Sequence, residues 1–272
     1  MPDQYAVIGN PVAHSKSPLI HAEFARQTGQ DLVYGQLLAP KDAFVATANA
    51  FRAGGGHGLN VTLPFKGEAF RFAAFLSERA SAAQAVNTLK FDRGVIFGDN
   101  TDGAGLVNDL LRNHSCDIAG RRILLLGAGG AARGVIEPLL QQQPAKLVLA
   151  NRTLNNARRL AQSFSSAFEA GTYAMLAGGQ FDLVVNATSA SLAGELPPLP
   201  PGVFARGALA YDMMYGKGET PFLAFARSEG AAQLADGLGM LVEQAAESFF
   251  VWRGLRPDSA PVLKLLRQAQ NA

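Results

Sequence analysis

The chain has 272 residues, of which 48% are hydrophobic and 17% charged, and its formal net charge at pH 7 is +2. This length can fill one or two packed domains, and the small net charge, without a long run of Lys or Arg, argues against a nucleic-acid-binding surface. The single cysteine, Cys116, excludes an internal disulfide framework and a cysteine-cluster metal site.

Signals for export, membrane insertion and metal binding are missing from the sequence. The first residues, Met-Pro-Asp-Gln, contain no basic segment before an apolar stretch, and no apolar run is long enough to span a bilayer. Metal-ligand spacing is absent at His14, His21, His57 and His114. We therefore expect a soluble cytoplasmic enzyme that binds no metal, no nucleic acid and no membrane.

Strand and helix patterns alternate along the first part of the chain. They predict strands at Tyr5–Ile8, Leu32–Leu38 and Gly58–Thr62, a helix capped by Ser17 and closed by Gly29, helices at Lys41–Arg52 and Pro64–Phe75, and a hairpin of Val86–Phe91 and Val95–Phe97. The alternation continues afterwards. It predicts helices at Ala104–Asn113, Met240–Arg253 and Ala260–Ala269, and strands at Ile123–Leu126, Leu147–Ala150, Leu183–Asn186 and Ala208–Asp212.

A glycine-rich turn follows the predicted strand Ile123–Leu126. Gly127 allows the tight turn, Gly129 lets the backbone approach a pyrophosphate, and Ala132 suits the close packing of helix and strand. The N–H groups at the start of the next helix then face the phosphates. This pattern predicts a dinucleotide site formed by Gly127, Ala128, Gly129, Gly130 and Ala131.

The end of the next predicted strand indicates which dinucleotide is bound. Chains that bind NAD usually place Asp or Glu there to hold the ribose 2′-OH, whereas this chain has Asn151, Arg152 and Thr153. One cation and two neutral polar groups suit a 2′-phosphate. The sequence therefore predicts NADP as the cofactor, held by a Rossmann domain.

Alternating strands and helices are typical of α/β folds with parallel sheets. We expect two domains, with glycine-rich stretches near Gly103 and Gly237 at their boundaries. The substrate domain would contain residues 1–103 and 238–272 around a mostly parallel sheet, and the NADP-binding Rossmann domain residues 104–237. The active site would lie in the cleft between the two domains.

Most of the polar segments of the first domain lie at or just beyond the carboxyl end of a predicted strand. The segments are His14–Pro18, Asn60–Lys66, Ala85–Thr88 and Asn100–Gly103. Because ligands of open α/β sheets bind outside the carboxyl ends of the strands, these segments could share one pocket. Hydroxyl and amide groups suit a substrate with several hydroxyls, and Lys66 suits proton transfer at the carbon that exchanges hydride.

Each of these residues also has a structural interpretation. Ser17 can cap a helix, Asn60 and Asn87 can pin turns, and Asp102 can cap the next helix. A lysine near a helix start, such as Lys66, is unfavourable for the helix dipole. Lys66 and Asp102 together, beside a hydride cofactor, therefore favour a catalytic pair.

The chain resembles the shikimate dehydrogenases over nearly its whole length and in the family's order. The matching stretches are Gly9–Pro18, Asn60–Lys66, Ala85–Thr88, Gly98–Gly103, Gly127–Ala131, Asn151–Thr153, Asn186–Ser189, Tyr211–Tyr215 and Asp236–Leu241, with Gln244. The resemblance implies reversible, NADPH-dependent reduction of 3-dehydroshikimate to shikimate, in chorismate and aromatic amino-acid biosynthesis. We expect a monomer or a homodimer with a small-molecule substrate.

The resemblance also implies roles for individual residues. Lys66 and Asp102 would be the catalytic pair. The substrate carboxylate would be bound by Ser15, Ser17 and Tyr215, and the hydroxyls and ring by Asn60, Thr62, Asn87 and Gln244. The cofactor side would be lined by Asn186, Thr188, Ser189, Met213 and Gly237.

The chain departs from the family pattern at three positions. Ala22 stands where Asn is common, Ser191 stands where Gly is common, and a basic residue expected near Asn156 is absent. The change at Ser191 leaves room for a different loop backbone. NADP selectivity is expected to rest more heavily on Arg152.

Three other functions are compatible with these residues. A quinate/shikimate dehydrogenase that accepts NAD would tend to have an acidic residue in place of Asn151-Arg152. A methyltransferase with the same glycine-rich turn would need an acid there for the ribose hydroxyls. A non-catalytic NADP-binding protein would not need Lys66 and Asp102, and a turnover assay separates it from an enzyme.

Overall fold

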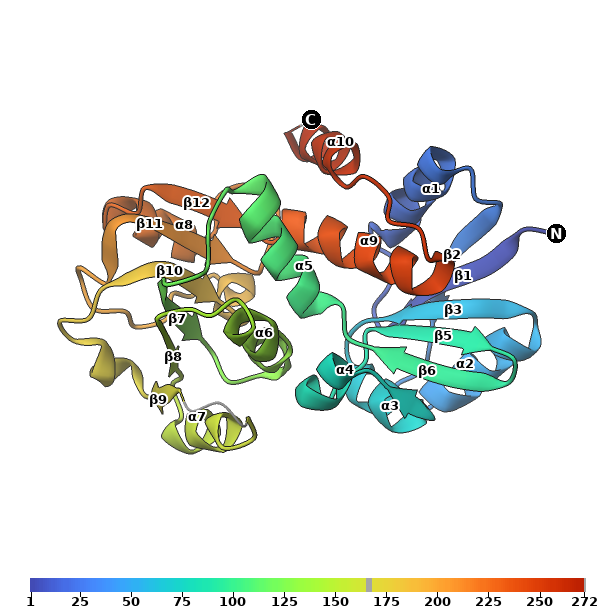
Figure 1. The fold of residues 1–272 in the computed structure, drawn as a ribbon, viewed down its shortest axis with the longest axis horizontal. Helices are drawn as coiled ribbons and strands as arrows, with labels where there is room; N and C mark the ends of the chain where they lie inside the picture. Colours follow the sequence, from blue (N-terminus) through green and yellow to red (C-terminus); the bar gives the residue numbers. More distant parts are fainter. Residues whose placement is uncertain (165–167, 272) are drawn as a thin grey trace. The chain divides into compact units, whose positions relative to one another are not determined.

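The structure is a computed structural model that describes residues 1–164 and 168–271. The chain divides into two compact units. Unit 1 consists of Met1–Gly105 and Val242–Leu265, and unit 2 of Leu106–Leu241 and Leu266–Ala272. The chain therefore leaves unit 1 after Gly105, returns at Val242 and leaves it again after Leu265. Each unit is built on a sheet of its own (Figure 1).

Unit 1 is built on a six-stranded sheet. Its strands are β1 (Asp3–Gly9), β2 (Leu32–Leu38), β3 (Gly56–Val61), β4 (Phe75–Leu76), β5 (Thr88–Asp92) and β6 (Val95–Asp99). Its helices are α1 (Ser17–Thr28), α2 (Phe44–Ala53), α3 (Lys66–Phe72), α4 (Glu78–Ala83) and most of α9 (Leu238–Arg253). The short elements β4 and α4 were not predicted, because they are too brief to show an apolar period.

The strand order in unit 1 is β2-β1-β3-β5-β6-β4. β1 pairs in parallel with β2 and β3, and β4 pairs in parallel with β6. β5 pairs antiparallel with both β3 and β6, and forms with β6 the predicted hairpin. Among the described strands of unit 1 only β5 runs against the others, so the predicted mostly parallel sheet is confirmed.

Apolar side chains cover both faces of this sheet. On one face Phe44 of α2 and Phe65, just before α3, stack with their ring centroids 5.3 Å apart. On the other face Phe24 of α1 meets Phe249 of α9 edge to face at 5.9 Å. Trp252 of α9 anchors that helix by donating to the backbone oxygen of Leu89 at 2.9 Å. Helix α9 is thus fixed on the sheet of unit 1 by buried aromatic contacts.

The start of α1 differs from the prediction. Lys16 occupies the N-cap position without a side-chain capping bond, and Ser17 is the first helical residue, followed by Pro18. The backbone N–H of Ser17 donates to Ser15 Oγ at 3.3 Å. The prediction that Ser17 caps the helix is therefore wrong, because the hydroxyl of Ser15 accepts from the first turn instead.

Unit 2 carries the remaining regular elements. Its strands are β7 (Arg122–Leu126), β8 (Lys146–Ala150), β9 (Glu169–Gly171), β10 (Phe181–Asn186), β11 (Phe204–Asp212) and β12 (Gln233–Asp236). Its helices are α6 (Gly130–Leu140), α7 (Leu154–Ala161) and α8 (Pro221–Ser228), with short turns of π-helix at Asp109–Asn113 and of 3₁₀-helix at Tyr173–Leu176 and Ala190–Ala193. Helices α5 (Asp102–Asn108) and α10 (Ala260–Asn271) belong partly to each unit.

The sheet of unit 2 has the order β12-β11-β10-β7-β8-β9, and all its pairs are parallel. The direction of winding reverses between β7 and β10, which is the arrangement of a doubly wound dinucleotide-binding sheet. The predicted Rossmann domain is therefore confirmed. The edge strands β9 and β12 were not predicted, because three and four residues give too little alternation to recognise.

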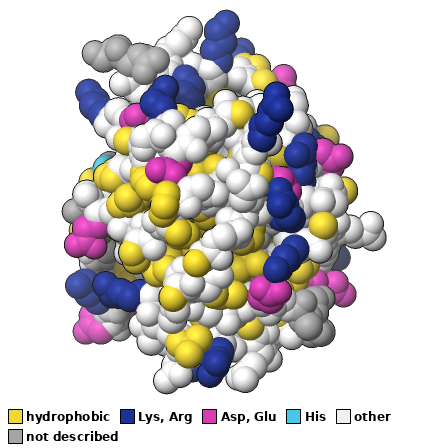
Figure 2. All heavy atoms as spheres, turned by 90° about the vertical axis from the view of Figure 1, so that its left-hand side faces the viewer, with side chains coloured by type: hydrophobic (Ala, Val, Ile, Leu, Met, Phe, Trp, Pro, Cys, Tyr) yellow, Lys and Arg dark blue, Asp and Glu magenta, His cyan; other side chains and the backbone are white. Residues whose placement is uncertain are grey.

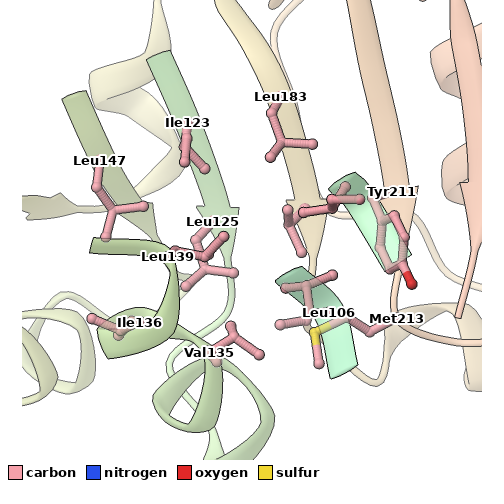
Figure 3. Packing of buried hydrophobic residues seen from close by; sticks show 14 of the residues in the cluster. Leu106, Ile123, Leu125, Val135, Ile136, Leu139, Leu147, Leu183, Tyr211 and Met213 are labelled. Atoms are coloured by element: carbon pink, nitrogen blue, oxygen red, sulfur yellow. The ribbon is translucent and has the colours of Figure 1, made fainter. Parts of the chain in front are cut away.

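Helix α6 packs on the centre of this sheet (Figure 3). Its buried residues Val135, Ile136 and Leu139 lie over Ile123 and Leu125 of β7. Fully burying an aliphatic side chain of this size stabilises a fold by about 1.5–3 kcal/mol. The packing fixes the first turn of α6, and with it the glycine-rich turn that precedes the helix.

The unit boundaries and the predicted domain boundaries differ by a few residues. The chain crosses after Gly105 within α5 and again after Leu241 within α9. Residues 266–272 group with unit 2, whereas the prediction kept them in the substrate domain. The domain limits and the active site in a cleft between the domains stay predictions.

Charged side chains on the described surface of unit 2 are often paired. Ion pairs join Arg122 to Asp182, Lys146 to Glu169 and Arg227 to Glu219, at 2.7–2.9 Å. Figure 2 shows one face of the molecule, on which Lys and Arg side chains are interspersed with Asp and Glu, and hydrophobic side chains are visible between them. Exposed pairs of this kind stabilise a fold by about 1 kcal/mol at most. No helix among the described residues is long and apolar enough to cross a membrane.

His21 lies on the buried side of α1 and is 1% exposed. Its ring stacks on Tyr34 of β2 with the centroids 4.3 Å apart, and its Nε2 lies 3.1 Å from Asn60 Oδ1. Because a carbonyl oxygen only accepts, Nε2 carries the proton, while Nδ1 has no hydrogen-bond partner among the described residues. Burial lowers the pKa of His21 from its ordinary 6.5 to about 3, against the opposing effect of the bond to Asn60.

The lowered pKa of His21 predicts a loss of stability in acid. Between the ordinary pKa of 6.5 and the folded value of about 3, the unfolded chain binds a proton that the folded chain does not. The free energy of unfolding of unit 1 should therefore fall by up to about 1.4 kcal/mol per pH unit as the pH drops below 6.5. His21→Gln should lose this part of the pH dependence. Urea unfolding at about pH 7 and about pH 5 measures it.

Fluorescence of Trp252, the single tryptophan of the chain, reports on unit 1, to which this residue belongs. The matched control is His14→Gln, which makes the same change at an exposed histidine of unit 1 and should keep the wild-type pH dependence. Equal pH dependence in wild type and His21→Gln would contradict the prediction.

Candidate active site

Most of the predicted substrate residues lie at one edge of the unit 1 sheet. Segment Ser15–Ser17 follows β1, Thr62 and Lys66 follow β3, and Asp102 follows β6. These three strands run in the same direction, so their carboxyl ends share one edge. Asn87 precedes the antiparallel strand β5 and therefore lies at the same edge. Strand direction alone thus collects side chains from four segments.

Lys66 and Asp102 form an ion pair at this edge. Lys66 Nζ lies 2.5 Å from Asp102 Oδ2, and the two side chains are 30% and 16% exposed. Each is the first residue of a helix, Lys66 of α3 and Asp102 of α5. The start of a helix favours Asp102 but disfavours Lys66, so the pair offsets an unfavourable position of the lysine. The remaining exposure leaves the ammonium group accessible to a ligand.

Asn87 fixes the second oxygen of Asp102. The backbone N–H of Thr101 donates to Asn87 Oδ1 at 2.8 Å, and since an N–H only donates, the orientation of the Asn87 amide is settled. Asn87 Nδ2 then donates to Asp102 Oδ1 at 2.8 Å. Both carboxylate oxygens of Asp102 are therefore bonded, one to Asn87 and one to Lys66.

Gln244 of α9 joins the same group. Its Oε1 lies 3.3 Å from Asn87 Nδ2 and 3.5 Å from Thr101 Oγ1. Considered alone, the sequence around Gln244 is typical of the solvated side of a helix. The structure instead places this amide against the buried polar residues that hold Asp102.

Ser248 lies one helical turn beyond Gln244, and sequence reasoning did not single it out. It is fully buried, and its Oγ lies 2.7 Å from Thr88 Oγ1 and 3.1 Å from Thr101 Oγ1. It also accepts from Asn60 Nδ2 at 3.0 Å. The only signal in the sequence was the spacing of four residues from Gln244, which places both side chains on one side of α9.

Asn60 is bonded within the protein at both ends of its amide. Its Oδ1 accepts from the hydroxyl of Tyr34 at 2.7 Å and from Nε2 of His21, while Nδ2 donates toward Ser248. Asn60 is 6% exposed. Its contacts brace the end of β3, the strand that precedes Lys66, and its direct contact with a substrate stays a prediction.

Ser15 and Ser17 lie together after β1. Ser15 Oγ lies 3.2 Å from Ser17 Oγ, and Gln36 of β2 donates to the backbone oxygen of Ser15 at 3.2 Å. Thr62 is held beside the end of β1, because its backbone N–H donates to the oxygen of Ile8 at 3.0 Å. The two hydroxyls and Thr62 therefore follow neighbouring strands, an arrangement suited to a carboxylate or a polyol.

The glycine-rich turn of unit 2 has the geometry that a dinucleotide needs. Gly127 has φ +102°, and a Cβ there would lie 3.0 Å from Thr188 Cγ2 and 3.2 Å from the backbone oxygen of Ala187. A Cβ at Gly129 or Gly130 would meet nothing within 4 Å. The turn is therefore closed on its inner side and open at the start of α6, where a pyrophosphate would receive backbone N–H groups.

Residues Asn151–Thr153 follow β8 next to this turn. Asn151 Nδ2 donates to the backbone oxygen of Thr153 at 2.9 Å, which shapes the segment around the exposed side chain of Arg152. No acidic side chain stands at the end of β8. The donor set, one guanidinium with hydroxyl and amide groups, fits a 2′-phosphate.

The remaining predicted cofactor residues follow β10, β11 and β12. Thr188 donates from its backbone N–H and its hydroxyl to Asn186 Oδ1, at 3.1 and 2.7 Å, and Ser189 follows it. A Cβ at Gly237 would lie 2.2 Å from the backbone oxygen of Met213, so only glycine allows these two loops to approach so closely. Thr188 and Met213 thus lie at the carboxyl edge of the unit 2 sheet, as expected for cofactor residues.

Tyr215 lies in unit 2, in the segment after β11. Burial raises the pKa of Tyr215, and the charge of Asp236 adds to the shift. Its hydroxyl is therefore a hydrogen-bond donor at neutral pH. Its predicted contact with a substrate carboxylate stays a prediction.

Three family profiles match this chain in succession. Residues 7–89 match the shikimate dehydrogenase substrate binding domain, residues 109–193 the family described as shikimate / quinate 5-dehydrogenase, and residues 237–267 the shikimate 5'-dehydrogenase C-terminal domain. The matched segments cover the site residues of both units, apart from a few between residues 89 and 109 and near residue 213.

Relatives agree with these profiles over almost the full length. The shikimate dehydrogenase (NADP(+)) of Nitrosospira multiformis is 62% identical over 271 residues, which are 99% of this chain and 98% of the relative. The crystal structure of an Ael1 enzyme from Pseudomonas putida has a TM-score of 0.92 at 51% identity, covering 97% of this chain and 98% of that one. Shikimate 5-dehydrogenase from Thermus thermophilus, in complex with NADP(H) and shikimate, has a TM-score of 0.88 at 32% identity and covers 98% and 99%. Because these relatives align with nearly the whole chain at this level of identity, the chain belongs to the shikimate dehydrogenase family.

Proposed function

We propose that this protein catalyses the reversible, NADPH-dependent reduction of 3-dehydroshikimate to shikimate. The observation that carries the proposal is the contact of Lys66 Nζ with Asp102 Oδ2 at 2.5 Å, at the edge of the sheet where the other polar residues gather. A positioned ammonium group can donate a proton to a carbonyl oxygen as hydride adds to its carbon. The family to which the chain belongs supports the choice of substrate.

Lys66 and Asp102 divide the acid–base chemistry. The bound cofactor supplies the hydride. Lys66 gives its proton to the ketone oxygen in reduction and takes it back in oxidation. Asp102 holds the ammonium group through Oδ2, orients a neighbouring substrate hydroxyl and balances the lysine charge. Asn87 holds the carboxylate by its other oxygen, so Asp102 keeps one orientation through the reaction.

Neutral polar groups then bind the rest of the substrate. We assign the carboxylate to Ser15 and Ser17, with help from Tyr215. The hydroxyls and the ring are assigned to Thr62, Asn87 and Gln244, braced by Asn60. Several neutral hydrogen bonds suit a polyhydroxylated ring, because each pairs one hydroxyl without adding charge beside Lys66.

The cofactor would be held by unit 2. The turn Gly127–Ala131 receives the pyrophosphate, and Asn151, Arg152 and Thr153 receive the 2′-phosphate of the adenosine half. Thr188, Ser189, Met213 and Gly237 lie along the other half. The open backbone at Gly129 and Gly130 supports binding of a pyrophosphate. The lack of an acid after β8 supports NADP over NAD.

The test is oxidation of shikimate with NADP, followed by absorbance of the reduced nicotinamide. Quinate and NAD are run in parallel, singly and together. Turnover mainly with shikimate and NADP supports the proposal. Faster turnover with quinate and NAD would favour a quinate/shikimate dehydrogenase, and no turnover with any pair would favour a non-catalytic NADP-binding protein.

Lys66→Met should lower kcat by about 10²- to 10⁴-fold, because it removes the proton donor and keeps the volume of the side chain. The KM for shikimate should change much less, since neutral groups supply most of the binding. Steady-state kinetics in both directions measure the effect. The matched control is Lys41→Met, at an exposed lysine of the same unit, which should keep wild-type activity. A Lys66→Met enzyme with a kcat near that of wild type would refute proton donation by this residue.

Arg152→Ala should weaken NADPH binding by about tenfold to a hundredfold and leave NADH binding nearly unchanged. The reason is that a guanidinium bonds a phosphate strongly and a ribose hydroxyl weakly. KM values for both cofactors measure the difference. Arg206→Ala, at an exposed arginine near the opposite end of β11, is the control. Equal losses for NADPH and NADH would contradict the prediction.

A further inference from the structure

Asp212 ends strand β11 as a fully buried carboxylate. No Lys, Arg or His among the described residues forms an ion pair with it. Instead its two oxygens accept four hydrogen bonds from neutral donors, which are Asn186 Nδ2 at 3.2 Å and Met214 N at 3.1 Å on Oδ1, and Ser191 Oγ at 2.7 Å and Thr220 Oγ1 at 2.6 Å on Oδ2. A buried carboxylate needs such bonds to offset the loss of its hydration.

The four donors come from two separate segments. Asn186 and Ser191 belong to the end of β10 and the turn after it, whereas Met214 and Thr220 belong to the connection from β11 to α8. One carboxylate therefore ties together the loops that follow two neighbouring strands. Because each oxygen binds one donor from each loop, movement of either loop would leave buried hydrogen-bonding groups unsatisfied.

The effect of Asp212 reaches Thr188 through Asn186. Since the Asn186 amide turns its Nδ2 to the carboxylate, its Oδ1 faces the other way and accepts both the backbone N–H and the hydroxyl of Thr188. The backbone N–H of Met213 also donates to the oxygen of Asn186 at 3.0 Å. The positions of Thr188 and Met213 are thus linked through two residues that do not themselves reach the surface.

These loops lie on one half of the unit 2 sheet. A doubly wound sheet binds the two mononucleotides of a dinucleotide on its two halves. Arg152 follows β8, in the half formed by β7, β8 and β9. Because the 2′-phosphate that Arg152 would bind belongs to the adenosine part of NADP, this half would hold the adenosine part. Asp212 belongs to the half formed by β10, β11 and β12, which is left for the nicotinamide part.

We propose that Asp212 and Ser191 are positioning residues for the nicotinamide half of the cofactor. Asp212 holds the loops after β10 and β11 in the arrangement that receives this half, and Ser191 supplies a hydroxyl to that anchor. The inference rests on the proposed use of NADP. It explains how the chain accommodates Ser191 where glycine is common in the family, because the hydroxyl has a partner in Asp212 and a second contact with Asn186 Nδ2 at 3.3 Å.

Ser191 is the residue to change, because it is only partly buried and its loss should not prevent folding. Calorimetric titration of wild type and Ser191→Ala compares two probes, NADPH and adenosine 2′,5′-bisphosphate. The second probe has the 2′-phosphate but no nicotinamide. We expect the Kd for NADPH to rise by about fivefold or more while the Kd for the bisphosphate stays within about twofold.

Two further variants serve as matched controls. Ser191→Thr keeps the hydroxyl and should retain most of the NADPH affinity. Ser228→Ala removes another serine hydroxyl of unit 2, one that bonds the backbone oxygen of Phe225, and should change neither Kd. These two variants separate the loss of the bond to Asp212 from the loss of any serine hydroxyl.

Three results would overturn the inference. They are an unchanged Kd for NADPH in Ser191→Ala, an equal rise for both probes, and a loss in Ser191→Thr as large as that in Ser191→Ala. An equal rise would mean that Ser191 supports the whole unit and not one half of the site. A wild-type protein that binds NADPH but does not oxidise shikimate would contradict the proposed function alone, since the comparison of the two probes needs no turnover.

Discussion

The hydrogen bond from the backbone N–H of Thr101 to Asn87 Oδ1 fixes the orientation of the Asn87 amide, and the arrangement of Asp102 and Lys66 in the candidate active site depends on it. An N–H group cannot accept, so the amide of Asn87 has one orientation, and its Nδ2 must face Asp102. Asp102 then has one oxygen left for Lys66. Because the bond to Thr101 belongs to the main chain, the arrangement depends on the turn after β6 and not on a mobile side chain. The backbone thus determines the orientation of the charged pair, as preorganised sites require.

Unit 2 contains a similar arrangement, but there an acceptor, and not a donor, orients the amide. There a carboxylate, Asp212, can only accept, and it orients the amide of Asn186, which in turn holds Thr188. In both units a group that can only donate or only accept hydrogen bonds fixes the orientation of an amide side chain, which can do both. Both devices lie at the carboxyl ends of strands, where a parallel sheet leaves backbone and side-chain groups unpaired by neighbouring strands. Parallel topology therefore creates the need for these polar anchors and also the place for a ligand.

Much of this arrangement could be predicted from the sequence, because its causes are local. The glycine-rich turn after an apolar strand, the absence of an acid after β8 and the polar segments after β1, β3 and β6 are all visible as spacing. Burial of polar residues is not. His21 and Ser248 stand on helices whose sequence does not distinguish a buried polar side chain from a solvated one, and their partners Asn60 and Thr88 are distant in the chain. The short strands β9 and β12 exist because longer neighbours pair with them, so their own residues carry little signal.

Lys66 and Asp102 form an ion pair in the unit 1 site, and the neutral residues next to Asp102 bear on how this pair can work. Asn87, which donates to Asp102, belongs to a group of neutral side chains that bond one another, with Asn60, Thr88, Thr101, Gln244 and Ser248. A second carboxylate among them would compete with Asp102 for the ammonium group, and a second cation would compete for the carboxylate. With neutral neighbours, Lys66 has Asp102 as its charged partner in the structure, and a ketone oxygen that arrives beside it finds one proton donor in a fixed position. In the proposed reaction, Asp102 would keep its bond to Asn87 after Lys66 gives up its proton, so the carboxylate would stay in place to receive the ammonium group again. The neutrality of the surrounding residues is therefore as much a part of the proposed mechanism as the charged pair itself.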